Sequence, residues 1–302
     1  MRRKLIRQGN NALTVTLPAK WLQENNLNAG DEIDIDYEGK VLSLSQSNKG
    51  KHEKTVSITV DTNDFELYRS LIGSYYRAGY DVINVHYSNV GTLLLLQKIV
   101  DVLYGFEILD SSETGCVIKN MYSFETTDVQ TYFTKMIHII TTMQSLIHNH
   151  VTSKKKCSDE ELSQFKFNAA KMRDIIARII VHEKSLDQNV FPYYLLSFNL
   201  WNITRNYYKI FKTLKYNAKL SPSSLSFFNE TNSFFSDFFG RLQKHSHSEI
   251  DKRYRTLVSN GELLQSDKNN QHLLLGYCIN ILMLLQSSNS TVLHLSLIHS
   301  SS

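Results

Sequence analysis

Cysteine is scarce in this sequence, and the few cysteines form no recognisable site. Cys116, Cys157 and Cys278 lie far apart in the 302 residues and match neither a zinc motif nor a redox motif. We therefore expect them to be small, reduced side chains of the core, as in a cytoplasmic protein.

Long apolar segments are also lacking. Basic residues follow Met1, but no apolar segment comes after them, which argues against a signal peptide. The most apolar late stretch, His272 to Leu285, is too short to span a bilayer and contains Asn280. We interpret this stretch as a buried helix and expect no membrane insertion.

Catalytic motifs are the third absence. The sequence has no nucleophile elbow, no paired-carboxylate motif and no His-x-x-x-His pair. Gly73, Gly79 and Gly91 are isolated, so they form no glycine-rich phosphate loop. These absences argue against an enzyme, and we expect neither catalytic residues nor a cofactor.

Glycine is unevenly distributed, and its distribution predicts the domain organisation. Nine of the twelve glycines lie in residues 1–115, and none lies between Cys116 and Phe239. Frequent glycine is typical of turns between short elements, whereas its absence favours long helices. The sequence therefore predicts an α+β multidomain protein with a β unit at residues 1–50, a small α/β domain at 51–123 and a helical domain at 124–302.

Residues 1–50 read as a compact β unit with separated charges. Two strand-like segments, KLIRQ and ALTVTL, lead into a short helix over Pro18–Asn25, and AGDEIDIDYEGKVLSLS reads as a hairpin. Residues 1–20 hold five basic side chains and no acid, whereas residues 21–38 hold six acids and no base. Because so small a unit buries too little surface to be stable alone, we expect it to form a homodimer.

The rest of the chain shows two successive patterns of apolar residues. Strands alternate with helices over residues 51–123 and end in a hairpin, which predicts a small α/β layer. Apolar residues then recur at helical spacing, which predicts an antiparallel bundle and a frayed tail after Ser287. The expected helices are Thr126–His150, Asp159–Glu183, Pro192–Tyr216, Pro222–Leu242, Glu249–Leu264 and Asn270–Gln286. A cluster of phenylalanines, residues 227–239, is expected to fill core or interface, since few basic residues lie among them.

The N-terminal segment resembles the AbrB/MazE/SpoVT swapped-hairpin family. Its motifs are a basic strand, then GNNALTVTLPAKWL, then the L-x-x-G-D-E-I pattern that begins at Leu27. This resemblance covers about residues 2–45 and implies an interlocked, dimeric β-barrel that commonly binds duplex DNA. The basic strand and the loop after it carry the DNA contacts in that family. By position, the resemblance places these contacts at Arg2, Arg3, Lys4 and Arg7, with Asn10, Asn11, Thr14 and Lys20 nearby.

The whole chain is similar to archaeal proteins that join such a domain to a PhoU-like helical domain. LLSFNLWNITRNYYKIFK resembles the PhoU signature, with Ile203 and Ile210 at its two isoleucines. In this register the metal-binding acids are replaced by Trp201 and Arg205. Glu183 and Asp187 remain as a weak candidate pair for a metal, because hard cations need more oxygen ligands than two carboxylates supply. We therefore expect a scaffold that holds no metal.

Two functional hypotheses remain open. The first is a cytoplasmic DNA-binding transcription regulator, linked by analogy to phosphate uptake, whose helical domain senses a signal or binds a protein partner. The alternative is a signalling adaptor that uses the N-terminal barrel only to dimerise and binds a transporter or a histidine kinase. Arginine can grip a phosphate or a guanine edge and asparagine can read adenine, so the first hypothesis has a chemical basis.

Overall fold

The structure is a computed structural model of the whole chain. It describes residues 2–9, 12–38, 41–46, 53–59, 64–89, 91–122, 128–152, 156–182, 190–216, 220–240, 247–266 and 271–300. The chain divides into two compact units, Met1–Glu53 and Lys54–Ser302, which are considered one at a time. The division of the chain into three domains stays a prediction.

The first unit consists of two separate hairpins with a short helix between them in the sequence. β1 (Ile6–Gln8) pairs antiparallel with β2 (Ala12–Thr14), and β3 (Ile33–Glu38) pairs antiparallel with β4 (Val41–Gln46). α1 (Ala19–Glu24) follows Pro18. The sequence predicts that Pro18 lies in the first turn of this helix, whereas the structure places it one residue earlier, at the N-cap. The two hairpins share no strand pairing, so the expected barrel is not formed within the described part of this one chain.

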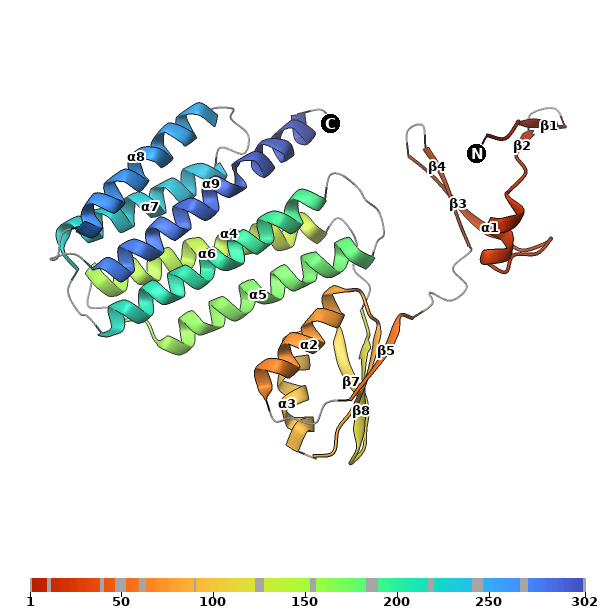
Figure 1. Cartoon of the computed structure of the whole chain (residues 1–302), viewed down its shortest axis with the longest axis horizontal. Coiled ribbons are helices and arrows are strands. Elements are labelled where there is room, and N and C mark those ends of the chain that lie inside the picture. Colours follow the sequence, from red (N-terminus) through yellow and green to blue (C-terminus); the bar gives the residue numbers. More distant parts are fainter. Residues whose placement is uncertain are drawn as a thin grey trace. The chain divides into compact units, whose positions relative to one another are not determined.

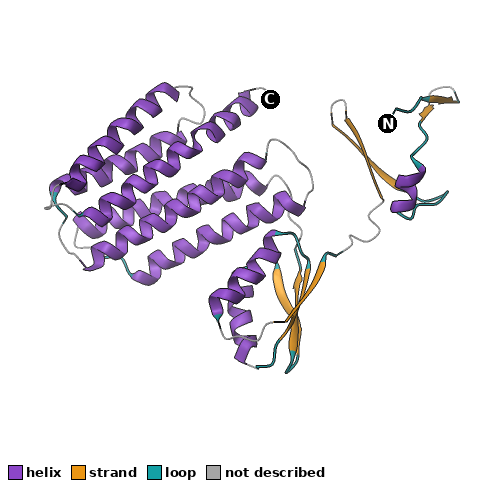
Figure 2. Ribbon diagram, viewed as in Figure 1, coloured by secondary structure: helices purple, strands orange, loops and turns teal. Residues whose placement is uncertain are grey.

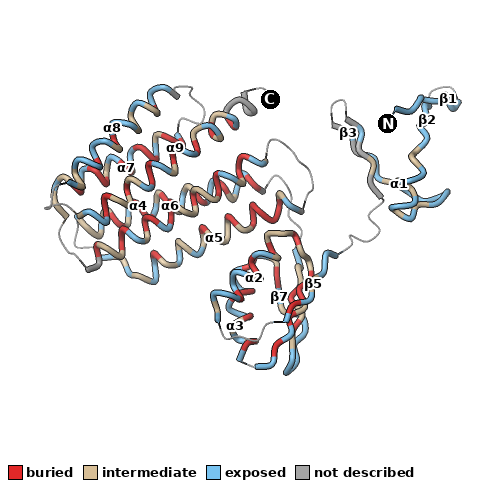
Figure 3. Tube along the Cα trace, viewed as in Figure 1, coloured by how far each residue is buried: buried red, intermediate tan, exposed pale blue. Residues whose placement is uncertain are grey.

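The hairpin of β3 and β4 has one apolar face that no described residue of its own unit buries. Ile35 lies opposite Leu44 and Tyr37 lies opposite Leu42, which places all four on one face of the ribbon. Tyr37 is 82% exposed, Leu42 58% and Ile35 56%. None of the described residues of Met1–Glu53 is buried, and in Figure 3 the described trace of this unit is pale blue or tan throughout.

The second unit begins with a four-stranded mixed sheet in the order β5-β6-β8-β7 (Figure 1). β5 (Thr55–Thr59) runs parallel to β6 (Val82–His86), and β8 (Gly115–Asn120) pairs antiparallel with both β6 and β7 (Phe106–Ser111). The crossovers contain α2 (Phe65–Arg77) and α3 (Gly91–Val100). Strands and helices therefore alternate as the sequence predicts.

Helices α2 and α3 bury one face of this sheet. Ile72 and Tyr76 of α2 are fully buried with Leu96 of α3 against Ile83 and Ile118 of the central strands. The Asp64 carboxylate caps α2 by accepting hydrogen bonds from the backbone N–H groups of the second and third helical residues.

Long helices make up the rest of the chain (Figure 2). They are α4 (Asp128–Thr152), α5 (Asp159–His182), α6 (Phe191–Tyr216), α7 (Pro222–Gly240), α8 (His247–Ser266) and α9 (His272–Ser300). Each corresponds to a predicted helix. The Ser158 and Ser221 hydroxyls accept N-terminal N–H groups of α5 and α7, as their capping positions predict.

The expectation of a frayed tail after Ser287 is wrong. α9 continues to Ser300, and Val292 and Leu295 are buried in the bundle core. Burial of these side chains stabilises the last turns, which local sequence composition does not reveal. No single described helix is long and apolar enough to cross a membrane, although the two segments of α9, His272–Ser287 and Asn289–Leu295, together reach that length and composition across a 41° bend.

A group of phenylalanines on one helix contributes to the bundle core. Phe227, Phe228, Phe234, Phe235, Phe238 and Phe239 of α7 are all buried, which confirms that the phenylalanine cluster is part of the core. Tyr207 of α6 is fully buried among these rings. Its hydroxyl accepts a hydrogen bond from Gln144 at 2.8 Å and donates one to Asn232 at 3.0 Å, so the buried polar group is satisfied.

A buried arginine joins the bundle to the sheet layer. Arg178 of α5 is 1% exposed, and its guanidinium donates to the carbonyls of Tyr76 and Tyr80 at 3.0 and 2.7 Å and to Asp81 at 2.7 Å. The same group lies 4.8 Å from the ring of Phe106. Arg178 therefore anchors the bundle to the end of α2 and the start of β6, an anchor that helical periodicity does not predict.

Candidate nucleic-acid interface

Basic side chains gather at the start of the first unit. Arg2, Arg3 and Lys4 lie in the extended segment before β1, and Arg7 lies within β1; all four are exposed. Arg7 is opposite Leu13 on β2, whereas Ile6 is opposite Thr14, so the large apolar side chains Ile6 and Leu13 lie on different faces of this ribbon. The structure thus keeps the four predicted cations on one continuous, solvent-facing segment.

The other predicted contact residues are less closely grouped. Thr14 faces its partner strand, where its hydroxyl donates to the carbonyl of Ile6 at 3.3 Å. Lys20 lies on α1 and forms an exposed ion pair with Glu24 at 3.7 Å. Asn10 and Asn11 lie outside the described residues.

Acidic residues occupy the second hairpin. Asp34 is exposed on β3, and strand alternation places it on the face opposite to Ile33 and Ile35. In the turn before β3, the backbone N–H of Asn28 donates a hydrogen bond to the Asp31 carboxylate at 2.7 Å. Four of the five basic residues of segment 1–20 therefore lie in or before β1 and Asp34 lies on the other hairpin, whereas Lys20 and Glu24 are paired on α1.

The part of the chain that the structure describes holds no group of three or more His, Cys, Asp or Glu side chains that could bind a metal ion. Glu183 and Asp187 both lie outside the described residues. At the PhoU-like positions, the guanidinium of Arg205 lies over the indole of Trp201 at 4.8 Å. An indole and a guanidinium supply no electron pair to a cation, so these residues do not fit the metal that the PhoU resemblance implies.

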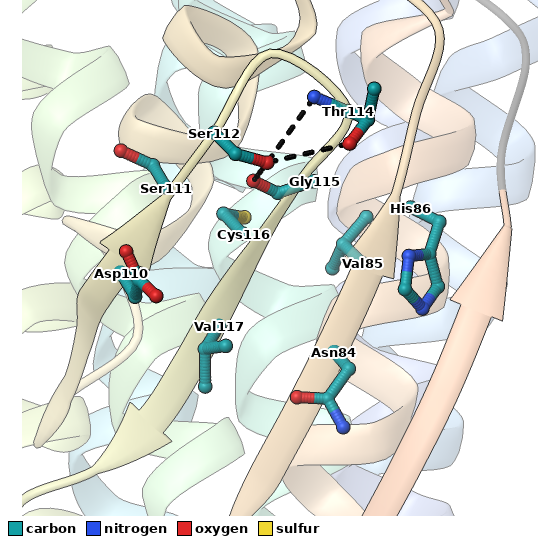
Figure 4. A pocket seen from close by; sticks show the side chains of 10 residues that line it. All are labelled: Asn84, Val85, His86, Asp110, Ser111, Ser112, Thr114, Gly115, Cys116 and Val117. Atoms are coloured by element: carbon teal, nitrogen blue, oxygen red, sulfur yellow. Dashed lines mark hydrogen bonds between the residues drawn. The ribbon is translucent and has the colours of Figure 1, made fainter.

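A hollow of about 310 Å³ lies at one end of the sheet, where β6 meets the β7–β8 turn (Figure 4). Its rim carries Asn84 and His86 of β6 and Asp110 of β7. The hydroxyl of Ser112 accepts the N–H of Thr114 and donates to the carbonyl of Gly115, so these polar groups are bonded within the turn. A Cβ on residue 115 would lie 2.7 Å from the Val85 carbonyl oxygen, which explains the glycine.

Comparison with known proteins gives one match. The family described as antidote-toxin recognition MazE, bacterial antitoxin, matches residues 6–44. No curated protein and no solved structure matches the chain. The matched segment spans both hairpins and α1. Residues 6–44 are therefore similar to a MazE/AbrB-like domain.

Proposed function

We propose that the protein is a DNA-binding transcription regulator that works as a homodimer through residues 1–50. The family match of residues 6–44 indicates a DNA-binding or antitoxin-like regulator, because MazE/AbrB-like domains typically dimerise and bind DNA. The observation that carries the proposal is the first unit itself, which joins an uncovered apolar hairpin to an exposed basic strand.

The uncovered apolar face supports the dimer. Covering a Leu, Ile or Tyr side chain stabilises by about 1.5–3 kcal/mol, and Ile35, Tyr37 and Leu42 are all left more than half exposed within their own unit. A second copy of the hairpin offers a face of the same shape and chemistry, as two-fold interfaces require. In the proposed dimer the hairpins of the two chains interlock into the barrel that one chain alone does not form.

The basic strand supports DNA as the ligand. Arg2, Arg3, Lys4 and Arg7 place four positive charges on a short segment with no acid among them. In a two-fold symmetric dimer the number of these positive charges doubles, and each chain presents its basic segment to the duplex. Contacts of this kind to phosphates release counterions, so affinity is expected to fall steeply as salt rises.

The test is binding of the full chain to fragments of genomic DNA at several salt concentrations. We expect saturable, salt-dependent binding that Arg3→Ala with Arg7→Ala weakens about tenfold or more, with a smaller salt dependence. The matched control is Lys252→Ala with Arg255→Ala, which removes the same two charges from the exposed face of α8.

Two outcomes contradict the proposal. If no fragment binds at low salt, the barrel only dimerises and the adaptor function is supported instead. If the control variant weakens binding as much as the Arg3 and Arg7 variant, the contact is not on the basic strand. Sequencing of the captured fragments identifies the operator in the same experiment.

For the second unit we propose a role in sensing or relaying a signal, without catalysis, in the cytoplasm. This proposal is supported by the large buried core of the helical bundle and by Arg178, which bonds the bundle to the sheet layer of the same unit. The PhoU-like assignment, the link to phosphate uptake and a protein partner on the helices rest on the sequence resemblance alone. Elemental analysis of the purified protein tests the absence of a metal, and stoichiometric iron, zinc or manganese would contradict it.

A further inference from the structure

A row of side chains crosses the face of the sheet that α2 and α3 leave uncovered. Residues that lie opposite each other in neighbouring strands point to the same face of a sheet. Asn84 of β6 lies opposite Val117 of β8, and Val117 lies opposite Asp110 of β7, so these three side chains share one face. His86 lies opposite Gly115 in the next row of that face. These five residues line the hollow at this end of the sheet (Figure 4).

A β-bulge in β7 places Asp110 on this face. Ile108 lies opposite Ile118 on the face that packs against the helices. The register then shifts by one residue, so that Asp110 lies opposite Val117. Without the extra residue, Leu109 would lie opposite Val117, and Asp110 would point toward the apolar core beneath the sheet, where a carboxylate is costly. The bulge therefore directs one acidic side chain to the hollow.

Gly115 leaves the position beside His86 empty. Its backbone lies so close to β6 that a Cβ would be 2.7 Å from the Val85 carbonyl oxygen, and a side chain at this position is therefore excluded. The hollow has a volume of about 310 Å³. This volume is at the lower end of the roughly 300–1,000 Å³ range of small-molecule pockets, so the hollow can hold a small organic molecule.

The hollow offers hydrogen-bond acceptors to a ligand. The Asp110 carboxylate is exposed and forms no ion pair or hydrogen bond with any described residue. The Asn84 amide donates through Nδ2 to the Ser57 hydroxyl at 3.3 Å, which leaves its oxygen on the side of β8 (Figure 4). The His86 imidazole is exposed and can donate or accept a hydrogen bond. The described residues that line the hollow include no lysine and no arginine, so its chemistry favours a cationic donor.

The spacing of the strands sets the size of the ligand. β6 and β7 are both neighbours of β8, so the backbones at Asn84 and Asp110 are about 10 Å apart. Strand side chains stand roughly perpendicular to the sheet, so the two side chains keep much of this separation. A single Mg²⁺ or Ca²⁺ ion binds oxygen ligands at about 2.0–2.6 Å and does not bridge such a gap. A short organic chain does, with half-buried Val117 beneath its apolar part.

We propose that this hollow binds a small primary amine with a second polar group on a short carbon chain. The ammonium group donates charge-assisted hydrogen bonds to the Asp110 carboxylate. The second group is either another ammonium, which donates to the Asn84 oxygen, or a carboxylate, which accepts a hydrogen bond from His86. The ligand is accordingly a diamine or an amino acid. This proposal adds a ligand class to the sensing role proposed for the second unit.

Calorimetric titration of the full-length protein distinguishes the two kinds of amine. The probes are putrescine, 4-aminobutyrate and 1,4-butanediol, which share a four-carbon chain and differ only in their end groups. We expect saturable heat with at least one of the two amines and none with 1,4-butanediol, which has no ammonium group. Saturation by putrescine alone identifies a diamine, and saturation by 4-aminobutyrate alone identifies an amino acid.

Substitutions locate the binding site. Asp110→Asn keeps the shape of the side chain but removes its charge, and it should raise the dissociation constant about tenfold or more. Val117→Phe fills the hollow while keeping every polar group, and it should weaken binding by a similar factor. The matched control is Glu107→Gln, which removes the same charge from the same strand at a position opposite Lys119 and outside the hollow, and it should leave binding unchanged. Melting temperatures verify folding, and Val117→Leu replaces Val117→Phe if the larger ring is not tolerated.

Four results would overturn the proposal. The first two are no saturation by either amine at millimolar concentration and equal binding of 1,4-butanediol. The others are equal weakening by Glu107→Gln and Asp110→Asn, and unchanged binding when the hollow is filled at Val117. Because the titration contains no DNA, its failure is distinguishable from failure of the proposed DNA-binding function.

Discussion

The two units of this chain differ in where their apolar side chains lie. In Lys54–Ser302, rings and branched aliphatic side chains are buried in two clusters, one under the sheet and one in the bundle. In Met1–Glu53, none of the described residues is buried, and Leu13, Ile35, Tyr37 and Leu42 are more than half exposed. The second unit therefore completes its core within one chain, whereas the first does not.

This difference separates two sources of stability. Because the second unit buries its core within one chain, we expect its free energy of unfolding not to depend on protein concentration. The apolar ribbon of the first unit can be covered only from outside its own unit, so we expect its order to depend on protein concentration. The following predictions test this comparison, from the largest expected effect to the smallest.

The largest effect is expected in the bundle core. Phe235→Ala removes a fully buried ring of α7 and should lower the free energy of unfolding of the second unit by about 4 kcal/mol. Urea unfolding followed by circular dichroism measures this loss, which should be the same at two protein concentrations tenfold apart. Phe167→Ala, on the exposed face of α5, is the control and should cost about 1 kcal/mol or less. Equal losses from the two variants would contradict the burial of Phe235.

Loss of the Arg178 contacts between the bundle and the sheet should cause the second largest decrease in the free energy of unfolding. Arg178→Ala removes the hydrogen bonds to Asp81 and to the carbonyls of Tyr76 and Tyr80 and should cost about 3 kcal/mol. A double-mutant cycle with Asp81→Asn measures the coupling between the two side chains. A coupling energy near zero would show that Arg178 acts through the carbonyls and through packing, and not through Asp81.

A smaller and different effect is expected in the first unit. Ile35→Ser removes an apolar side chain from the β3–β4 face and should weaken the dimer about tenfold or more, because each chain loses the contact. Sedimentation over a range of concentrations measures the dissociation constant. Unfolding of the second unit should not change. A dimer of unchanged strength would place the interface on another surface.

The smallest effect on stability is expected at α1. Lys20→Ala breaks an exposed ion pair with Glu24 and should change the free energy of unfolding by about 0.5 kcal/mol or less. If Lys20 contacts a phosphate, the same variant reduces the salt dependence of DNA binding by about one charge. Unchanged salt dependence, measured in the same DNA titration, would remove Lys20 from the interface.

Much of the local structure is predictable from residue patterns. Alternating apolar residues on both sides of Glu38-Gly39 predict the β3–β4 hairpin, and glycine-poor segments with helical periodicity predict all six helices of the bundle. Caps such as Ser158 and Ser221 act on neighbours in the sequence, so their roles can be read directly. The basic strand is predictable for the same reason, since its four cations are consecutive or nearly so.

The sequence by itself predicts the helices and strands of this protein and the gathering of basic residues at its start, because these follow from neighbouring residues; the partner of the first unit stays a prediction. Only the tertiary structure decided that Arg178 bonds to residues about 100 positions away and that α9 stays helical to Ser300. These features depend on which helices pack side by side. Helix packing depends on how well extended side-chain surfaces fit together, and a local sequence pattern does not reveal this fit.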